Sequence, residues 1–189
     1  MAGARGFSKA FWICLPEMEI AMLCKRIVAA LAATLGLCAQ QDTSTHQDHS
    51  NTVSQRGDQV MGFSHEKTTH HFRLFPDGGA IEVTANDPGD AESRAQIRTH
   101  LSHIAGMFAS GDFDAPMLIH SRVPPGVPVL KRLKTEVAYT FEEMDGGGRV
   151  RIRTGNRKAL AAVYQFLRFQ IADHQTGDAT GITQPADEK

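Results

Sequence analysis

Cysteine is scarce in this chain of 189 residues, and its three cysteines, Cys14, Cys24 and Cys38, all lie in the first fifth. A main body without thiols cannot form a disulfide, a thiolate zinc site, an iron–sulfur cluster or a cysteine nucleophile. Aromatic residues make up only 7% of the chain, and the single tryptophan is Trp12. All nine histidines lie beyond residue 39, so any soft-metal chemistry of the body depends on histidine and methionine.

A charge excess of either sign is also missing. The chain has 20 Lys and Arg against 21 Asp and Glu, for a net charge of -1. This balance gives no general reason to bind nucleic acid or an anionic membrane surface, and we expect no nucleic-acid partner. The length, with 41% hydrophobic and 22% charged residues, indicates one soluble globular domain with tails.

No apolar run is long enough to cross a bilayer. The longest, Ile27–Leu37, follows a basic pair and is typical of a secretory signal peptide. We therefore interpret residues 1–39 as a leader, with Met22 as the expected start, although a buried N-terminal helix is the alternative. Cleavage by ordinary signal peptidase near residues 38–40 is favoured over lipid attachment at Cys38, which would be the mature protein's membrane anchor. Either route predicts an exported, periplasmic or extracellular protein.

The remaining chain divides by composition into a body and two tails. Residues 40–61 are almost purely polar and predict a disordered tether. His46 and His49 in this tether either bind metal weakly or are simply polar tail residues. Residues 62–176 form the predicted domain, and residues 177–189 are expected to be a flexible tail.

The body contains a weak internal repeat. Residues 70–84 and 138–153 each alternate apolar with polar residues around an Asp-Gly turn, which predicts two hairpins. A helix is expected after each hairpin, from Ala91 behind an Asp90 N-cap to about Phe108, and from Arg157 to about His174. We predict an α+β fold in which two ββα units form a four-stranded antiparallel sheet, with both helices packed on one face.

Spacing on the predicted helices separates a core stripe from a possible ligand stripe. At 100° per residue, Ile97, Leu101, Ile104 and Phe108 share one face, as do Leu160, Val163, Leu167 and Ile171. On the first helix, a separate stripe of histidine and methionine lies beside the apolar stripe.

That second stripe contains His100, His103 and Met107, and one connection later come Met117 and His120. Imidazoles with thioethers suit copper, and imidazoles alone suit zinc, so these five residues form our candidate metal site. His70 and His71 are further candidates, but they point to opposite faces of a strand, so at most one can join. The alternative is that His100 and His103 pack against the second helix without a ligand.

Other motifs favour binding over catalysis. The sequence from His65 to His70 nearly matches a zinc-protease motif, but its second histidine is one residue too far along. Ser121 has no nucleophile elbow around it. Arg149, Arg151 and Arg153 share one strand face, which is either ordinary solvation or a surface for a peptide, envelope component or second copy. His174 is interpreted as a structural residue that meets the negative end of a helix dipole.

Several stretches resemble a family of small exported bacterial proteins. They are HEKTTHHF at 65–72, DGGAIEVTAND at 77–87, GDFDAPMLIH at 111–120, PPGVP at 124–128 and FLRFQIADH at 166–174. Some members carry the name aspartate carbamoyltransferase. That enzyme family looks like a two-domain protein of roughly 300 residues with a Ser-Thr-Arg-Thr phosphate loop at a helix start, which this chain lacks. The resemblance therefore implies export and one compact domain, and it carries over no catalytic residue.

Overall fold

A computed structural model describes residues 52–184 of the chain. The predicted leader, signal peptide, Cys38, His46 and His49 lie outside the described residues. A helix at 52–61 comes first. It is followed by η1 (His65–Lys67), β1 (Thr68–Phe75), β2 (Gly78–Ala85), α3 (Ala91–Ser110), α4 (Asp114–His120), α5 (Val127–Arg132), η2 (Lys134–Glu136), β3 (Ala138–Met144), β4 (Gly147–Arg153) and α6 (Arg157–His174).

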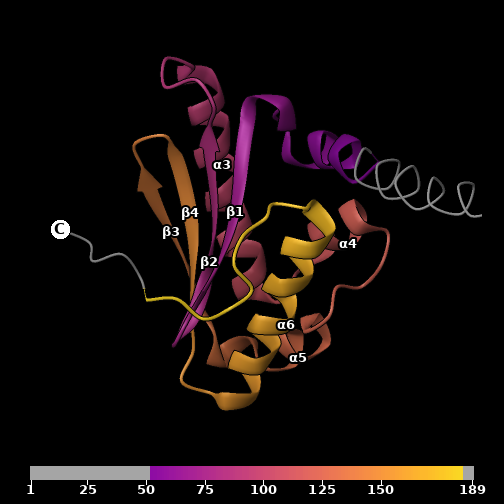
Figure 1. Ribbon diagram of the computed structural model, residues 1–189. Coiled ribbons are helices and arrows are strands. Elements are labelled where there is room, and N and C mark those ends of the chain that lie inside the picture. The colour runs from indigo at the N-terminus through magenta and orange to yellow at the C-terminus, as the bar shows by residue number, and fades with distance from the viewer. Residues whose placement is uncertain (1–51, 185–189) are drawn as a thin grey trace, which may run out of the picture. The chain divides into compact units, whose positions relative to one another are not determined.

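The four strands form one antiparallel sheet in the order β1-β2-β4-β3 (Figure 1). Both predicted hairpins are present, with tight turns between β1 and β2 and between β3 and β4. The two units join through the inner strands, where Ile81 of β2 pairs with Val150 of β4. The predicted α+β fold built from two ββα units is confirmed.

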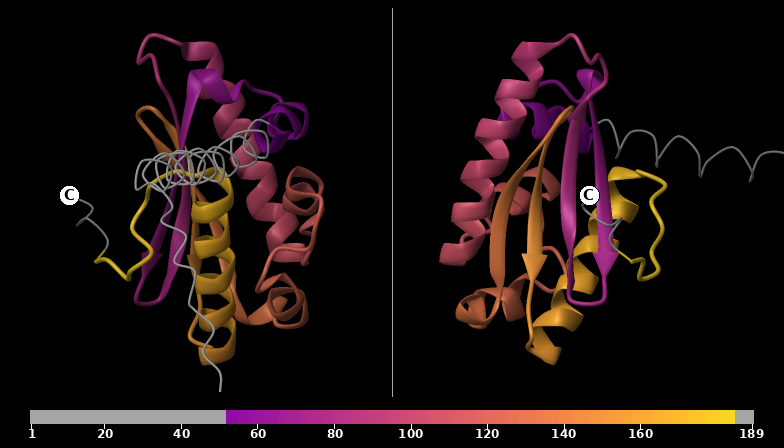
Figure 2. Two further views of the ribbon diagram at one scale, coloured as in Figure 1. Left: turned by 45° about the vertical axis from the view of Figure 1, so that its right-hand side comes forward. Right: turned by 90° about the vertical axis from the view of Figure 1, so that its left-hand side faces the viewer.

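The helices lie on one side of the sheet, and the other face is open (Figure 2). Each long helix crosses to the hairpin of the other unit: α3 lies mainly against β3 and β4, whereas α6 lies against β1 and β2. One unit alone would therefore leave both its hairpin and its helix uncovered. Because α6 packs on the hairpin of the other unit, its C-terminal end lies next to β1.

The core between the sheet and the helices follows the predicted stripes. Ile97, Leu101, Ile104 and Phe108 of α3 are all buried. Asp90 caps this helix as expected, with its carboxylate accepting from the Ser93 N–H at 2.9 Å. On α6 the stripe residues Val163, Leu167 and Ile171 are buried. From the sheet, the alternate residues of β1, β2 and β4 that face the helices complete this core: Phe72, Leu74, Ile81, Val83, Val150 and Ile152.

The two predicted tails are ordered where the structure describes them, which corrects the expected domain limits. Residues 52–61 of the expected tether are helical, and Val60 and Met61 of this helix pack against the core. The apolar residues of the segment 52–61 recur at helical spacing, so the segment covers the core although its composition is polar. In the expected C-terminal tail, the carboxylate of Asp178 accepts from the Phe72 N–H at 2.9 Å, so the segment is docked on β1.

The open face carries ion pairs rather than a free positive stripe. Arg149, Arg151 and Arg153 all point to this face, but Arg149 donates to Glu142 at 2.5 Å and Arg151 donates to Asp77 at 2.6 Å. Arg153 lies 3.8 Å from the same aspartate. Within residues 52–184, no helix has the length and apolar character needed to cross a membrane.

Candidate functional site

A small cavity lies between the sheet and the helices, and four histidines line it. Its volume is about 70 Å³, and most of its wall is apolar. The space is large enough for at least one water or for an ion. The polar or sulfur-bearing side chains in its wall are Met61, His70, His100, His120, Gln170 and His174.

Only two of the five predicted ligands meet at this cavity. His100 and His120 line it, whereas His103 is exposed to solvent. Met107 is partly buried against the core. Met117 lies on the outer side of α4, where its Sδ is 4.0 Å from the Lys131 Nζ. The structure therefore does not bring the predicted set together.

Helix geometry explains the difference. Of the α3 stripe, His100 lies nearest in angle to the core residues, so it turns inward while His103, one turn on, faces solvent. The connection after α3 forms a seven-residue helix, α4. His120 is three positions after Met117, but the burial of α4 is one-sided, so His120 points inward while Met117 stays at the surface.

His120 is the most tightly held residue of the site. Its side chain is 0% exposed, and its Nδ1 lies 2.5 Å from Asp173 Oδ2. The same carboxylate accepts from Arg122 Nη2 at 2.5 Å. The other ring nitrogen, Nε2, lies 2.9 Å from Gln170 Oε1. An Nδ1–H that donates to a carboxylate fixes the ring orientation and directs Nε2 to the cavity side.

His174 stands between His120 and His70. Its ring centroid is 5.0 Å from that of His120 and 6.0 Å from that of His70. These three imidazoles come from α4, α6 and β1, which are far apart in sequence. His70 Nε2 is buried without a hydrogen-bond partner, and so is Gln170 Nε2. Because a buried polar atom without a partner is costly, His70 Nε2 is a candidate contact for a ligand, whereas turning the Gln170 amide by 180° would let its NH2 donate to His120 Nε2.

The predicted alternation of the two strand histidines is confirmed. His70 lines the cavity, whereas His71 lies on the open side, with Nδ1 2.8 Å from Asp178. The edge of the Phe63 ring meets His100 at 5.5 Å between centroids, and the same phenyl ring stacks on His70 at 6.1 Å.

The surroundings keep three of these imidazoles neutral at pH 7. Burial lowers the pKa of His70 to about 4, and neighbouring histidines act in the same direction. Burial, together with the nearby His103, also lowers the pKa of His100 to about 4. Burial lowers the pKa of His174 to about 3, with further contributions from His120 and His70. Neutral imidazole is the form that binds a metal.

Sequence patterns exist, but are weak, for His70, which was predicted only as a further candidate, and for Gln170 and His174, which were not predicted as ligands. His70 has the same parity along β1 as Phe72 and Leu74, which places it on the buried face of the strand. Gln170 and His174 follow Phe166 at steps of four on α6, so all three share a face. The contact between His120 and Asp173, 53 residues apart, has no local pattern.

No three histidine, cysteine or acidic side chains within residues 52–184 already converge closely enough to hold a metal ion. Comparisons with protein-family models, with curated proteins and with solved structures found no match to this chain. The fold and the cavity therefore carry the functional argument alone.

Proposed function

We propose that this chain is a small exported metal-binding protein that holds one copper ion, or a zinc ion, at His70, His120 and His174. The observation that carries the proposal is the gathering of three imidazoles from three separate elements at one small cavity. The buried, unpartnered Nε2 of His70 supports it. Export remains an expectation from the sequence of the leader.

The spacing of the rings is close to what one ion requires. A metal lies about 2.0–2.1 Å from an imidazole nitrogen. From this length, two rings on one tetrahedral ion have centroids about 5 Å apart. The centroids of His120 and His174 are 5.0 Å apart, and those of His70 and His174 are 6.0 Å apart. Binding then requires rotation of the rings and a closure of about 1 Å on the His70 side.

His120 already has the environment of a metal ligand. In metal sites, a ligating histidine commonly donates its second N–H to a carboxylate, which orients the ring and raises its basicity. Asp173 is in that position, 2.5 Å from Nδ1, and Arg122 holds the carboxylate from its other oxygen. The ion would replace the side-chain amide of Gln170 as the partner of Nε2.

Met61 favours copper over zinc at this site. It is the one thioether among the side chains that line the cavity, and sulfur ligands of this kind select Cu(I). In the sequence prediction the thioethers came from Met107 and Met117, and both are placed elsewhere. Met61 therefore takes their part in the proposed copper site.

A competition titration of metal-stripped protein tests the proposal. We expect one Cu(I) per chain, held against a chromophoric chelator, and weaker binding of Zn(II). Replacing one ligand, as in His70→Gln or His174→Gln, is expected to weaken binding at least about tenfold. The matched control is His103→Gln, because this histidine is on the solvent side of α3. Equal affinity in all four proteins, or no binding tighter than about 10 μM, would refute the proposal.

A further inference from the structure

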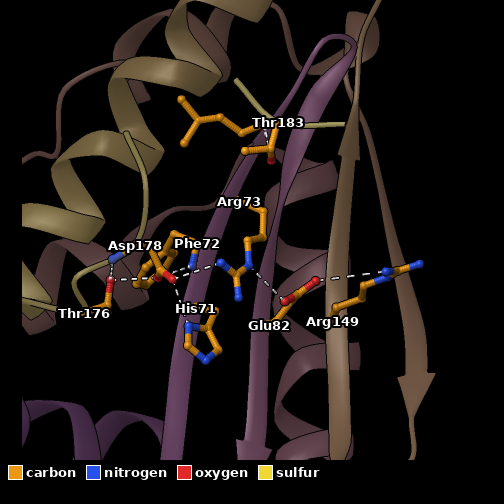
Figure 3. A network of polar contacts seen from close by, with 9 residues as sticks. His71, Phe72, Arg73, Glu82, Arg149, Thr176, Asp178 and Thr183 are labelled. Carbon is orange, nitrogen blue, oxygen red and sulfur yellow. Dashed lines mark hydrogen bonds and ion pairs between the residues drawn. The ribbon is translucent and has the colours of Figure 1, made fainter. Parts of the chain in front are cut away.

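The segment after α6 returns to the sheet and lies along the outer edge of β1. Helix α6 ends at His174, and Gln175 adopts a left-handed backbone with φ of 53° that reverses the chain. Asp178 and Thr183 of the following segment contact β1, as the close view shows (Figure 3). One of the proposed ligands, His174, therefore directly precedes this segment, and another, His70, lies on the strand it contacts.

Asp178 is the main point of attachment. Its side chain is 4% exposed, and its carboxylate accepts from the Phe72 N–H at 2.9 Å. It also accepts from Arg73 Nη1 at 3.1 Å and from the Thr176 hydroxyl at 2.7 Å. Burial alone would raise the pKa of Asp178, but the hydrogen bonds from Phe72, Thr176 and His71 outweigh it and keep the pKa below its ordinary value.

A second attachment lies further along the same edge. The Thr183 N–H donates to the Leu74 carbonyl at 2.8 Å. β1 is an outer strand of the sheet, so its outward N–H and C=O groups would otherwise be unpaired. The segment is also tied back to α6, because Arg168 Nε donates to the Thr180 carbonyl at 2.9 Å. Residues 175–184 thus bond to β1 at two places and to α6 at a third.

These attachments act on the same part of the molecule as the histidines. Phe72, whose N–H binds Asp178, is two residues from His70, and its ring centroid is 5.5 Å from that of His174. A change in the distance between β1 and the end of α6 would change the distance between His70 and His174. Arg73 also lies 3.4 Å from Glu82 of β2, which itself does not contact residues 175–184.

We propose that residues 175–184 are a latch that fixes the end of α6 to β1, with Asp178 as the residue that positions His70 and His174 for the metal. The positioning role rests on the proposed metal site, whereas the latch itself does not. Asp178 does not contact the metal in this account, and it acts only through the backbone of β1 and the turn after α6.

Two measurements on the full chain test this inference: hydrogen exchange of the Phe72 amide and of residues 176–184, and Cu(I) affinity by chelator competition. Asp178→Asn is the variant. It preserves the side-chain shape but removes the charge that accepts from Phe72, His71 and Arg73. Glu82→Gln is the control, because it removes the next charge of the network without touching the segment. Thermal unfolding of each variant shows that it is folded.

In Asp178→Asn we expect exchange to rise at least about tenfold and Cu(I) affinity to fall about tenfold. Glu82→Gln should change neither by more than about twofold. Unchanged exchange in Asp178→Asn would refute the latch. Faster exchange with unchanged affinity would refute the positioning role alone. If the wild-type protein binds no copper, the proposed metal site and the positioning role both fail, and the exchange data still decide whether the latch exists.

Discussion

Acid should unfold the metal-free protein well above the pH at which carboxylates titrate. Burial lowers the pKa of His70 and of His100 to about 4 and that of His174 to about 3. The same residues have a pKa near 6.5 in the unfolded chain. As the pH falls below 6.5, the unfolded chain takes up these protons first, so the free energy of unfolding decreases until the folded-state pKa values are reached.

The expected loss is large for a chain of this size. For one histidine with a folded pKa of about 4, the linkage relation gives a loss of about 2 kcal/mol between pH 7 and pH 5. Three such residues would together remove about 5 kcal/mol, which is comparable to the whole stability of a small domain. The stability is therefore fully present above about pH 7 and lost mostly between pH 6.5 and 4.

Urea unfolding at a series of pH values, with a chelator present, measures this loss. Replacing His174 by Gln should flatten the pH dependence between pH 6.5 and 4.5, whereas replacing the exposed His103 by Gln should leave the slope unchanged. If the free energy of unfolding of the wild-type protein varies by less than about 1 kcal/mol across that range, the histidines are not buried as neutral groups and the reasoning is refuted.

Three further substitutions test the packing. Asp173→Ala should lower the free energy of unfolding, measured in urea, by about 3–5 kcal/mol, because it leaves His120 and Arg122 without their carboxylate. The control is Glu143→Ala, which should cause little change because this side chain is 68% exposed. Gly79→Ala would place a Cβ 2.3 Å from a strand carbonyl oxygen and from a leucine of α6, so we expect a loss of at least about 3 kcal/mol, and a native melting temperature would contradict the hairpin packing. Gly106→Ala meets nothing within 4 Å, and calorimetry should show a gain of up to about 1 kcal/mol.

The fold was predictable because its determinants are local. Hairpin turns and two apolar helix stripes are periodic features, and both ββα units were predicted from them. The crossing of α3 and α6 to the opposite hairpins depends on how the units pack, which periodicity does not encode. Residues 52–61 and 177–184 were mispredicted because polar composition was given more weight than the few apolar or charged residues that dock them. One buried carboxylate, that of Asp178, is enough to order a segment that is otherwise polar.

The candidate site was predicted only in part, for a related reason. Three of the five ligands predicted from the sequence were chosen because they share a helix, and that spacing is visible in sequence. The smaller angle of His100 to the core stripe of α3 turns it inward, and weighing this angle would have separated it from His103. The grouping of His70, His120 and His174 arises from three elements that meet only after folding. The sequence around each of these histidines, taken separately, gives no sign of a metal site.

The most direct test of the central claim is side-chain nitrogen NMR of the histidines during titration of the full chain with Zn(II), a diamagnetic ion that imidazoles bind. We predict that one ring nitrogen in each of His70, His120 and His174 shifts and that all three changes are complete at one equivalent. The nitrogens of His103 should be unaffected. Shifts confined to other histidines, or the absence of any shift that saturates at one equivalent, would contradict the proposed metal site.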